Sequence, residues 1–140
     1  MYETQMYQQQ QIARTTRIEL LLALYDKAIQ RLHDAQSSLE QADLAAAAPS
    51  MLQAQMIVYA LASGVDTENQ DCEATQNTLR LFEFVLYCLS FSDARKVGVA
   101  RRVLTTLREG FERIGEEATT LELAGKIPAL KATAALRATA

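Results

Sequence analysis

The sequence contains few residues that break helices or crosslink a chain. Among 140 residues there are two Pro, five Gly, two Cys, one His and no Trp. No segment alternates apolar and polar residues in the manner of a half-buried strand. Apolar residues make up 49% of the chain and charged residues 22%, a composition typical of folded proteins. The length and this composition predict one all-α domain with few turns.

The scarcity of Cys and His excludes the common chemical sites of small helical proteins. Cys72 and Cys88 are too few for a disulfide framework or for a zinc site with four Cys or His ligands. His33 has no Glu three residues before it, so the paired Glu-x-x-His motif of di-iron bundles is missing. No glycine-rich phosphate loop is present. We expect no metal ligands, no cofactor and no catalytic residues, with an enzyme of unrecognised type as an open alternative.

The charge distribution and the N-terminus bear on location and partners. The formal net charge is −3, and Lys and Arg are scattered among acids, so nucleic acid is not an expected partner. The Gln-rich N-terminus lacks the basic start and apolar run of a secretory signal, which predicts a cytoplasmic protein. The uncharged stretch from Leu44 to Val65 contains Pro49, Ser50, Gln53 and Gln55, which are costly in hydrocarbon, so no membrane insertion is expected.

Apolar residues at intervals of three and four predict two long helices in the first half of the chain. Thr16 and Glu19 have the spacing of a capping box, which places the start of the first helix there. The second helix begins at Asp43, with a kink at Pro49, or near Pro49 itself. We expect it to run to about Ser63, with Gly64 in the left-handed conformation that often ends helices.

Two more helices are predicted in the second half, from Thr75 to Phe91 and from a cap at Ser92 or Asp93 to about Ala118. Short connections between four long helices indicate an antiparallel four-helix bundle. Residues 16–118 form the bundle in this interpretation. Residues 1–15 are an N-terminal extension or short helix, and residues 119–140 are a mobile or loosely docked C-terminal tail.

Three of the four helices carry more apolar residues than one core-facing stripe requires. The second helix has no charged residue, Phe84 and Phe91 lie off the core stripe of the third, and Leu20 and Leu24 lie off that of the first. The last helix has an ordinary charged side. This excess predicts a surface for a partner's helix or a homodimer face, because large uncovered apolar patches are rare on monomers. The alternative is that these helices are central or are covered by the chain's own ends.

Several motifs in the chain are shared with a known family. Thr16-x-x-Glu19-Leu-Leu-Leu-x-Leu-Tyr-Asp26 is the most specific of them. Others are Tyr7-Gln8 and Ile12, Ala54-Gln55 with Ile57-Val58-Tyr59, Leu81-Phe82-x-Phe84, and Leu104-x-x-Leu107-Arg108-Glu109-x-Phe111. From about Tyr7 to Ile114 the chain resembles the flagellar export chaperones of the FliS type.

The resemblance implies a cytoplasmic chaperone that binds the disordered C-terminal segment of flagellin, prevents its premature polymerisation and delivers it to the flagellar export gate. A homo-oligomeric structural or interaction bundle remains the alternative. Asp26 is left with two roles, as the partner of a nearby Lys or Arg or as a contact to the client. Tyr7 and Ile12 would belong to a segment that covers the groove when it is empty. The expected client contacts are Tyr7, Ile12, Leu20, Leu24, Tyr25, Gln55, Ile57, Tyr59, Phe84 and Phe91.

Overall fold

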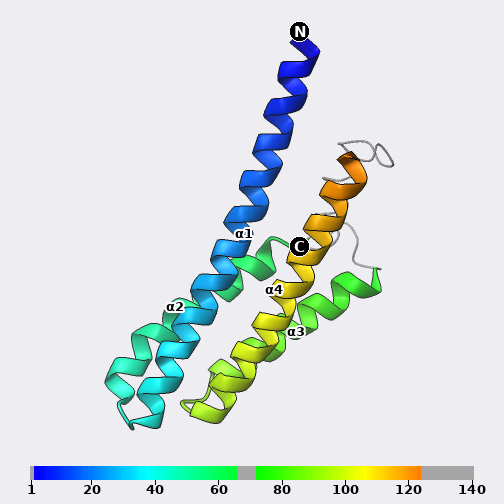
Figure 1. The fold of residues 1–140 in the computed structure, drawn as a ribbon. Coiled ribbons are helices and arrows are strands. Elements are labelled where there is room, and N and C mark those ends of the chain that lie inside the picture. The colour runs from blue at the N-terminus through cyan, green and yellow to red at the C-terminus, as the bar shows by residue number, and fades with distance from the viewer. Residues whose placement is uncertain (1, 66–71, 124–140) are drawn as a thin grey trace.

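The chain forms a bundle of long helices in a computed structural model that describes residues 2–65 and 72–123. These residues contain α1 (Tyr2–Glu40), α2 (Leu44–Ser63), α3 (Glu73–Leu89) and α4 (Ala94–Leu123). Successive helices run in opposite directions (Figure 1). Contacts join α1 to α2, α2 to α3, α3 to α4 and α4 back to α1. The predicted all-α fold, an antiparallel four-helix bundle, is confirmed.

The core follows the helical periodicity of the sequence. On α2 the buried residues recur at intervals of three and four, as expected for one face of a helix. An aromatic cluster joins three helices, since the Tyr25 ring lies 6.5 Å from that of Phe82 and 6.1 Å from that of Phe111. The largest fully buried side chains are Phe82, Leu32, Leu89, Leu104, Val58, Val85, Val97 and Thr75.

The first helix is longer than the sequence indicated. It begins at Tyr2, so the expected helix start at Thr16 is wrong. No Gly or Pro lies between Tyr2 and Glu40, and the Gln and Ala residues before Thr16 are good helix formers, so nothing in this stretch interrupts the helix. The N-terminal part of α1 projects beyond the other helices (Figure 1). Cover of the empty groove by residues 1–15 stays a prediction.

The connection between α1 and α2 is a tight turn built on a left-handed alanine. Ala42 has φ 58°. The amide of Asp43 donates to the carbonyl of Ser38 at 2.9 Å, and that of Ala42 donates to Leu39 at 3.0 Å, the bond pattern of a Schellman motif. The Asp43 carboxylate then accepts from the amide of Ala46 at 3.1 Å and caps α2. The second helix thus starts after Asp43, and Pro49 lies inside it.

The other helix ends differ from the predictions by a few residues. Gly64 ends α2 with φ −82°, so the expected left-handed conformation is wrong. The third helix starts at Glu73, two residues before Thr75. Asp93 caps α4, as its carboxylate accepts from the amide of Arg95 at 3.0 Å. That helix continues to Leu123, and residues 124–140 of the predicted tail lie outside the described residues.

Candidate partner-binding surface

The outer side of α2 is apolar and exposed. This helix contains no charged residue. Its inward side packs into the core through Ala47, Met51, Ala54, Val58 and Leu61. Leu52, Met56 and Tyr59 follow at intervals of four and three on another side, with exposed fractions of 56%, 63% and 62%. We call these three residues the α2 stripe; they present a Leu, a Met and a phenol ring to solvent with no charge among them.

A second apolar row lies along α3. Leu81, Phe84, Tyr87 and Phe91 are all exposed, and they are spaced by three, three and four residues. We call them the α3 stripe, although Phe91 follows the end of the helix. The rings of Tyr87 and Phe91 pack edge to face, with centroids 5.2 Å apart. Tyr87 is 58% exposed despite this contact.

A hydrogen bond from Gln55 fixes α2 against the end of α3. Its Nε2 donates to the backbone carbonyl of Leu89 at 3.0 Å. Leu89 is the last residue of α3, where carbonyls have no partner within the helix, so this bond satisfies one of them. Leu52 and Tyr59 lie three residues before and four after Gln55, on the same side of α2. The α2 stripe therefore borders the contact between α2 and α3.

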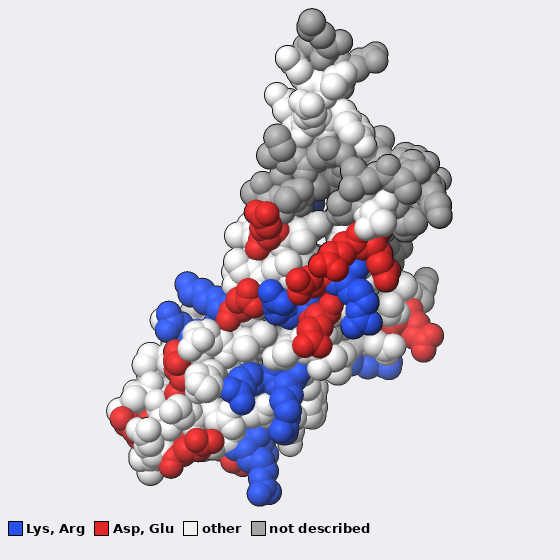
Figure 2. Space-filling view, viewed as in Figure 1, with Lys and Arg blue, Asp and Glu red and all other residues white. Residues whose placement is uncertain are grey.

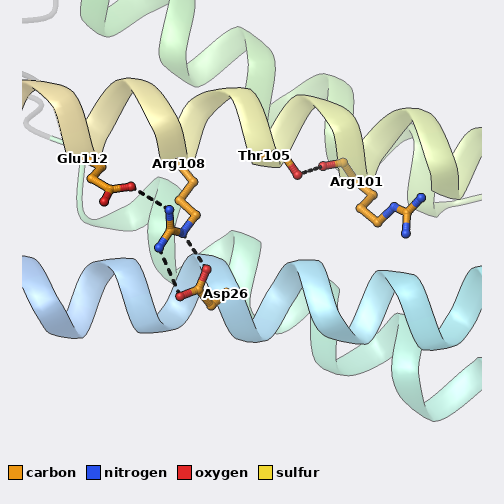
Figure 3. Close-up of polar contacts among 5 residues, drawn as sticks. All are labelled: Asp26, Arg101, Thr105, Arg108 and Glu112. Atoms are coloured by element: carbon orange, nitrogen blue, oxygen red, sulfur yellow. Dashed lines mark hydrogen bonds and ion pairs between the residues drawn. The ribbon is translucent and has the colours of Figure 1, made fainter.

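The charged residues gather on a different face. Figure 2 shows Lys, Arg, Asp and Glu side chains spread over the face formed by α1 and α4. There Arg108 of α4 donates to Asp26 of α1 through Nε at 2.5 Å and through Nη2 at 3.4 Å, and to Glu112 through Nη1 at 2.7 Å (Figure 3). The bond to Asp26 raises the pKa of the Arg108 guanidinium, which stays charged. Asp26 is therefore the partner of an arginine, which is one of the two roles that the sequence left open for it.

A second polar contact joins the same two helices. A guanidinium nitrogen of Arg101 lies 2.7 Å from Nδ1 of His33. Because Arg only donates, Nδ1 of His33 is the acceptor in this contact. Close to this pair α1 and α4 approach tightly, since a Cβ on Gly98 would lie 2.7 Å from Nε2 of Gln36. This face holds α1 to α4 through polar groups and lacks the apolar rows of α2 and α3.

The predicted contact residues divide into exposed and packed groups. Tyr59, Phe84 and Phe91 are exposed and belong to the two stripes. Leu20 and Tyr7 are exposed on α1, outside both stripes. The side chain of Ile12 lies outside the described residues.

The remaining predicted contacts are engaged within the bundle. Tyr25 is only 6% exposed, and burial raises the pKa of its phenol to about 12. The prediction that Tyr25 contacts the client at the surface is therefore wrong, because the Tyr25 ring fills the space between Phe82 and Phe111. Leu24 and Ile57 are partly buried and pack against the core, and the amide of Gln55 bonds to Leu89.

Four further exposed apolar residues belong to the two stripes and were not among the predicted contacts: Leu52, Met56, Leu81 and Tyr87. Leu81, which belongs to one of the shared motifs, is exposed. The sequence spacing could have identified Tyr87, because Tyr87 lies three residues after Phe84 and four before Phe91. A row that continues Phe84 to Phe91 on one side of the helix must include Tyr87.

Other chemical features of the described residues are limited. Within 2–65 and 72–123 no group of three or more His, Cys, Asp or Glu side chains is placed to hold a metal ion. Cys72 and Cys88 are free thiols, and burial raises the pKa of Cys88. By length and composition alone α2 could cross a membrane, but a core helix of a soluble bundle meets the same criterion. One side of α2 is indeed packed in this core.

Comparison with known proteins agrees with the motifs and the fold. A family model described as "Flagellar protein FliS" matches residues 1–118. No curated protein and no solved structure matches the chain. The family match covers α1, α2, α3 and most of α4, including both apolar stripes and the projecting part of α1.

Proposed function

Because the chain belongs to the FliS family of flagellar proteins, we propose that it binds the disordered C-terminal segment of flagellin in the cytoplasm, prevents premature polymerisation and delivers it to the flagellar export gate. Family membership itself implies a general chaperone role in flagellar export and binding to flagellar proteins. FliS is a chaperone family and not an enzyme family. The identity of the client, the binding mode and the delivery step belong to the proposal.

The observation that carries the proposal is the α2 stripe, a row of three exposed apolar side chains on a helix with no charge. An amphipathic segment that becomes helical on binding can lay its apolar face along such a row. Burial of about 1,000 Å² of apolar surface would contribute on the order of 25 kcal/mol at about 25 cal/mol per Å². Most of this is offset by the cost of ordering the segment and of association, so the complex can be specific and still release its client.

We propose the two stripes as the main client contacts, with Leu20 as a further contact on α1. Tyr59 and Tyr87 combine a flat apolar ring with a hydroxyl that can bond to a client's backbone or side chain. Met56 has an unbranched side chain that adapts to the shape of an incoming apolar residue. Leu24, Gln55 and Ile57 support the surface from below, and Tyr25 stabilises the core.

The test is a binding measurement between the full chain and the C-terminal segment of flagellin from the same organism. Wild type, Met56→Asp and Tyr59→Asp are compared by calorimetry and by size at micromolar concentration. Both substitutions add a charge to the α2 stripe and should abolish detectable binding. Thr106→Asp is the matched control, because Thr106 is exposed on α4, which carries neither stripe. Circular dichroism checks that each variant retains its helices.

Each outcome bears on the proposal. Binding by wild type and Thr106→Asp, with loss in both α2 variants, supports it. No complex with wild type contradicts the proposal, and a tight dimer that does not exchange with the segment favours the homo-oligomeric bundle. Equal binding by all four chains would place the client elsewhere on the molecule. A substitution at Ile57 is a poor test, since Ile57 packs against the core and a charge there would disturb folding.

A further inference from the structure

The side chain of Lys96 lies at the Phe91 end of the α3 stripe. The Nζ of Lys96 lies 3.4 Å from the centroid of the Phe91 ring and 6.0 Å from that of Tyr87. An ammonium over an aromatic face is attracted by the negative charge density of the ring. Lys96 belongs to the first turn of α4, so its side chain reaches from α4 to the aromatic end of the α3 stripe. In the free chain this side chain covers one face of Phe91.

Lys96 forms no ion pair with an acid in the part of the chain that the structure describes. The ion pairs found within the described ranges join Arg31 to Asp34 and Arg108 to Asp26 and Glu112, and none involves Lys96. Asp93, the nearest acid in sequence, uses its carboxylate to cap α4. The first turn of α4 contains no acid, and the positive end of a helix dipole disfavours a cation there. A carboxylate brought to this corner would therefore be attracted by Lys96 and by the helix end together.

We infer that Lys96 selects client segments in which an acidic side chain follows or precedes the apolar residue that covers Phe91. This inference rests on the proposed function, because it concerns the client of the same surface. The partner chemistry is an Asp or Glu side chain of the C-terminal segment of flagellin. Lys96 is then a specificity-determining residue at one end of the surface, and it sets the direction in which the segment lies along the α3 stripe.

The physical reason is the fate of the ammonium when Phe91 is covered. An apolar client residue on Phe91 displaces Lys96 from the ring face and excludes water from part of its side chain. A segment without an acid leaves the cation at the edge of an apolar interface with no partner, which costs free energy. A segment with an acid at that place compensates the cost through an ion pair. Such a charge penalises wrong partners in addition to attracting the right one.

The experiment is a double-mutant cycle between Lys96 and the acids of the client. Synthetic peptides of the flagellin C-terminal segment are made with each Asp or Glu replaced in turn by Asn or Gln. Their affinities are measured for wild type, Lys96→Met and Lys96→Arg. Met keeps an unbranched apolar stem without the charge, and Arg keeps the charge and the ability to lie on an aromatic ring. Lys27→Met is the matched control, because Lys27 is an exposed lysine on α1, outside both stripes.

One acid in the peptide should couple to Lys96. Lys96→Met should weaken binding of the unmodified peptide about twofold to fivefold, the range expected for a partly exposed ion pair. The same variant should bind the peptide that lacks the coupled acid more tightly than wild type binds it, because no cation is then left without a partner at the apolar interface. Lys96→Arg should retain the affinity, and Lys27→Met should change it less than twofold.

The outcomes separate the inference from the proposed function. If wild type binds the peptide and Lys96→Met binds it equally well, or if every acid substitution costs the same in both chains, the inference is overturned and the proposed function stands. If wild type does not bind the peptide, both the inference and the proposed function are overturned. Coupling confined to the peptide's terminal carboxylate, detected with an amidated peptide, also overturns the commitment to an acidic side chain. Retained helicity of Lys96→Arg and Lys96→Met shows that folding is not the cause.

Discussion

Arg108 and Asp26 connect the last helix of the bundle to the first across 82 residues of sequence. Two nitrogens of the Arg108 guanidinium donate to the two carboxylate oxygens of Asp26, in a side-by-side arrangement (Figure 3). Glu112, one turn further along α4, accepts from a third nitrogen and holds the guanidinium in place. Asp26 closes the most specific motif of the chain, and its partner shows that this position serves to align α1 with α4.

The pair is expected to contribute to stability and not to client binding. Asp26→Asn and Arg108→Gln should each lower the free energy of unfolding by up to about 1 kcal/mol, with a coupling of about 0.5–1 kcal/mol in the double variant, since the pair is partly exposed. Urea unfolding of the four chains measures this. Affinity for the flagellin segment should stay within about twofold in Asp26→Asn. A large loss of affinity without loss of stability would instead show that Asp26 contacts the client.

Burial of Tyr25 should make stability fall at high pH. The pKa of its phenol is raised to about 12 in the folded chain, from an ordinary value of 10.0. Between pH 10 and 12 the unfolded chain therefore binds fewer protons at this group than the folded chain, and stability decreases as pH rises. Two pKa units correspond to about 2–3 kcal/mol. Unfolding of wild type and Tyr25→Phe from pH 8 to 12 should show a steeper decline in wild type, and Tyr59→Phe should behave like wild type.

The left-handed alanine between α1 and α2 offers a simple gain in stability. At φ 58° the Cβ of Ala42 is close to backbone atoms, which costs on the order of 1 kcal/mol relative to glycine. Ala42→Gly should raise the free energy of unfolding by up to about 1 kcal/mol. Gln41→Gly, one residue earlier, should lower it, because it only adds freedom to the unfolded chain. Destabilisation by Ala42→Gly would show that the turn does not use the left-handed conformation.

Charges along α4 run against its dipole. The first turn contains no acid and the last turn no base, whereas a helix is stabilised by the opposite arrangement. Arg95→Glu should therefore raise the free energy of unfolding by about 0.3–1 kcal/mol at low salt, and the gain should shrink at high salt. Arg102→Glu makes the same charge change at an exposed mid-helix position and should have little effect. Equal gains in both variants would indicate an effect of net charge instead of the dipole.

The fold was predictable from the sequence wherever periodicity was regular. The core residues of α2 recur at intervals of three and four, and the cap at Asp43 has the expected side chain. The start of α1 was not predictable from Thr16 and Glu19, because a capping box inside a long helix has the same letters as one at its end. Gly64 misled in the same way: glycine permits the left-handed conformation but does not require it. Among the non-glycine residues that the structure describes, the one with positive φ is Ala42, which no propensity would indicate.

The surface was harder to predict residue by residue. Phe84 and Phe91 were recognised because they lie off the core stripe of their helix, and Tyr59 because it belongs to a helix without charged residues. The role of Tyr25 was wrongly predicted, because a tyrosine in such a motif fits a binding site as readily as a core, and only its neighbours Phe82 and Phe111 show that it lies in the core. The position of Lys96 over Phe91 depends on the turn between α3 and α4, which periodicity does not describe.

The α2 stripe also bears on how much of this protein a cell can hold unoccupied. Every free copy presents the same uncharged row to every other copy, and encounters between copies rise with the square of their concentration. Solubility then limits the concentration of unbound protein, and a partner that covers the row raises this limit. Synthesis in proportion to the partner, with little surplus, is the regime that such a surface favours. Overproduction without the partner should lead first to self-association, at a concentration that a charge on Met56 or Tyr59 would raise.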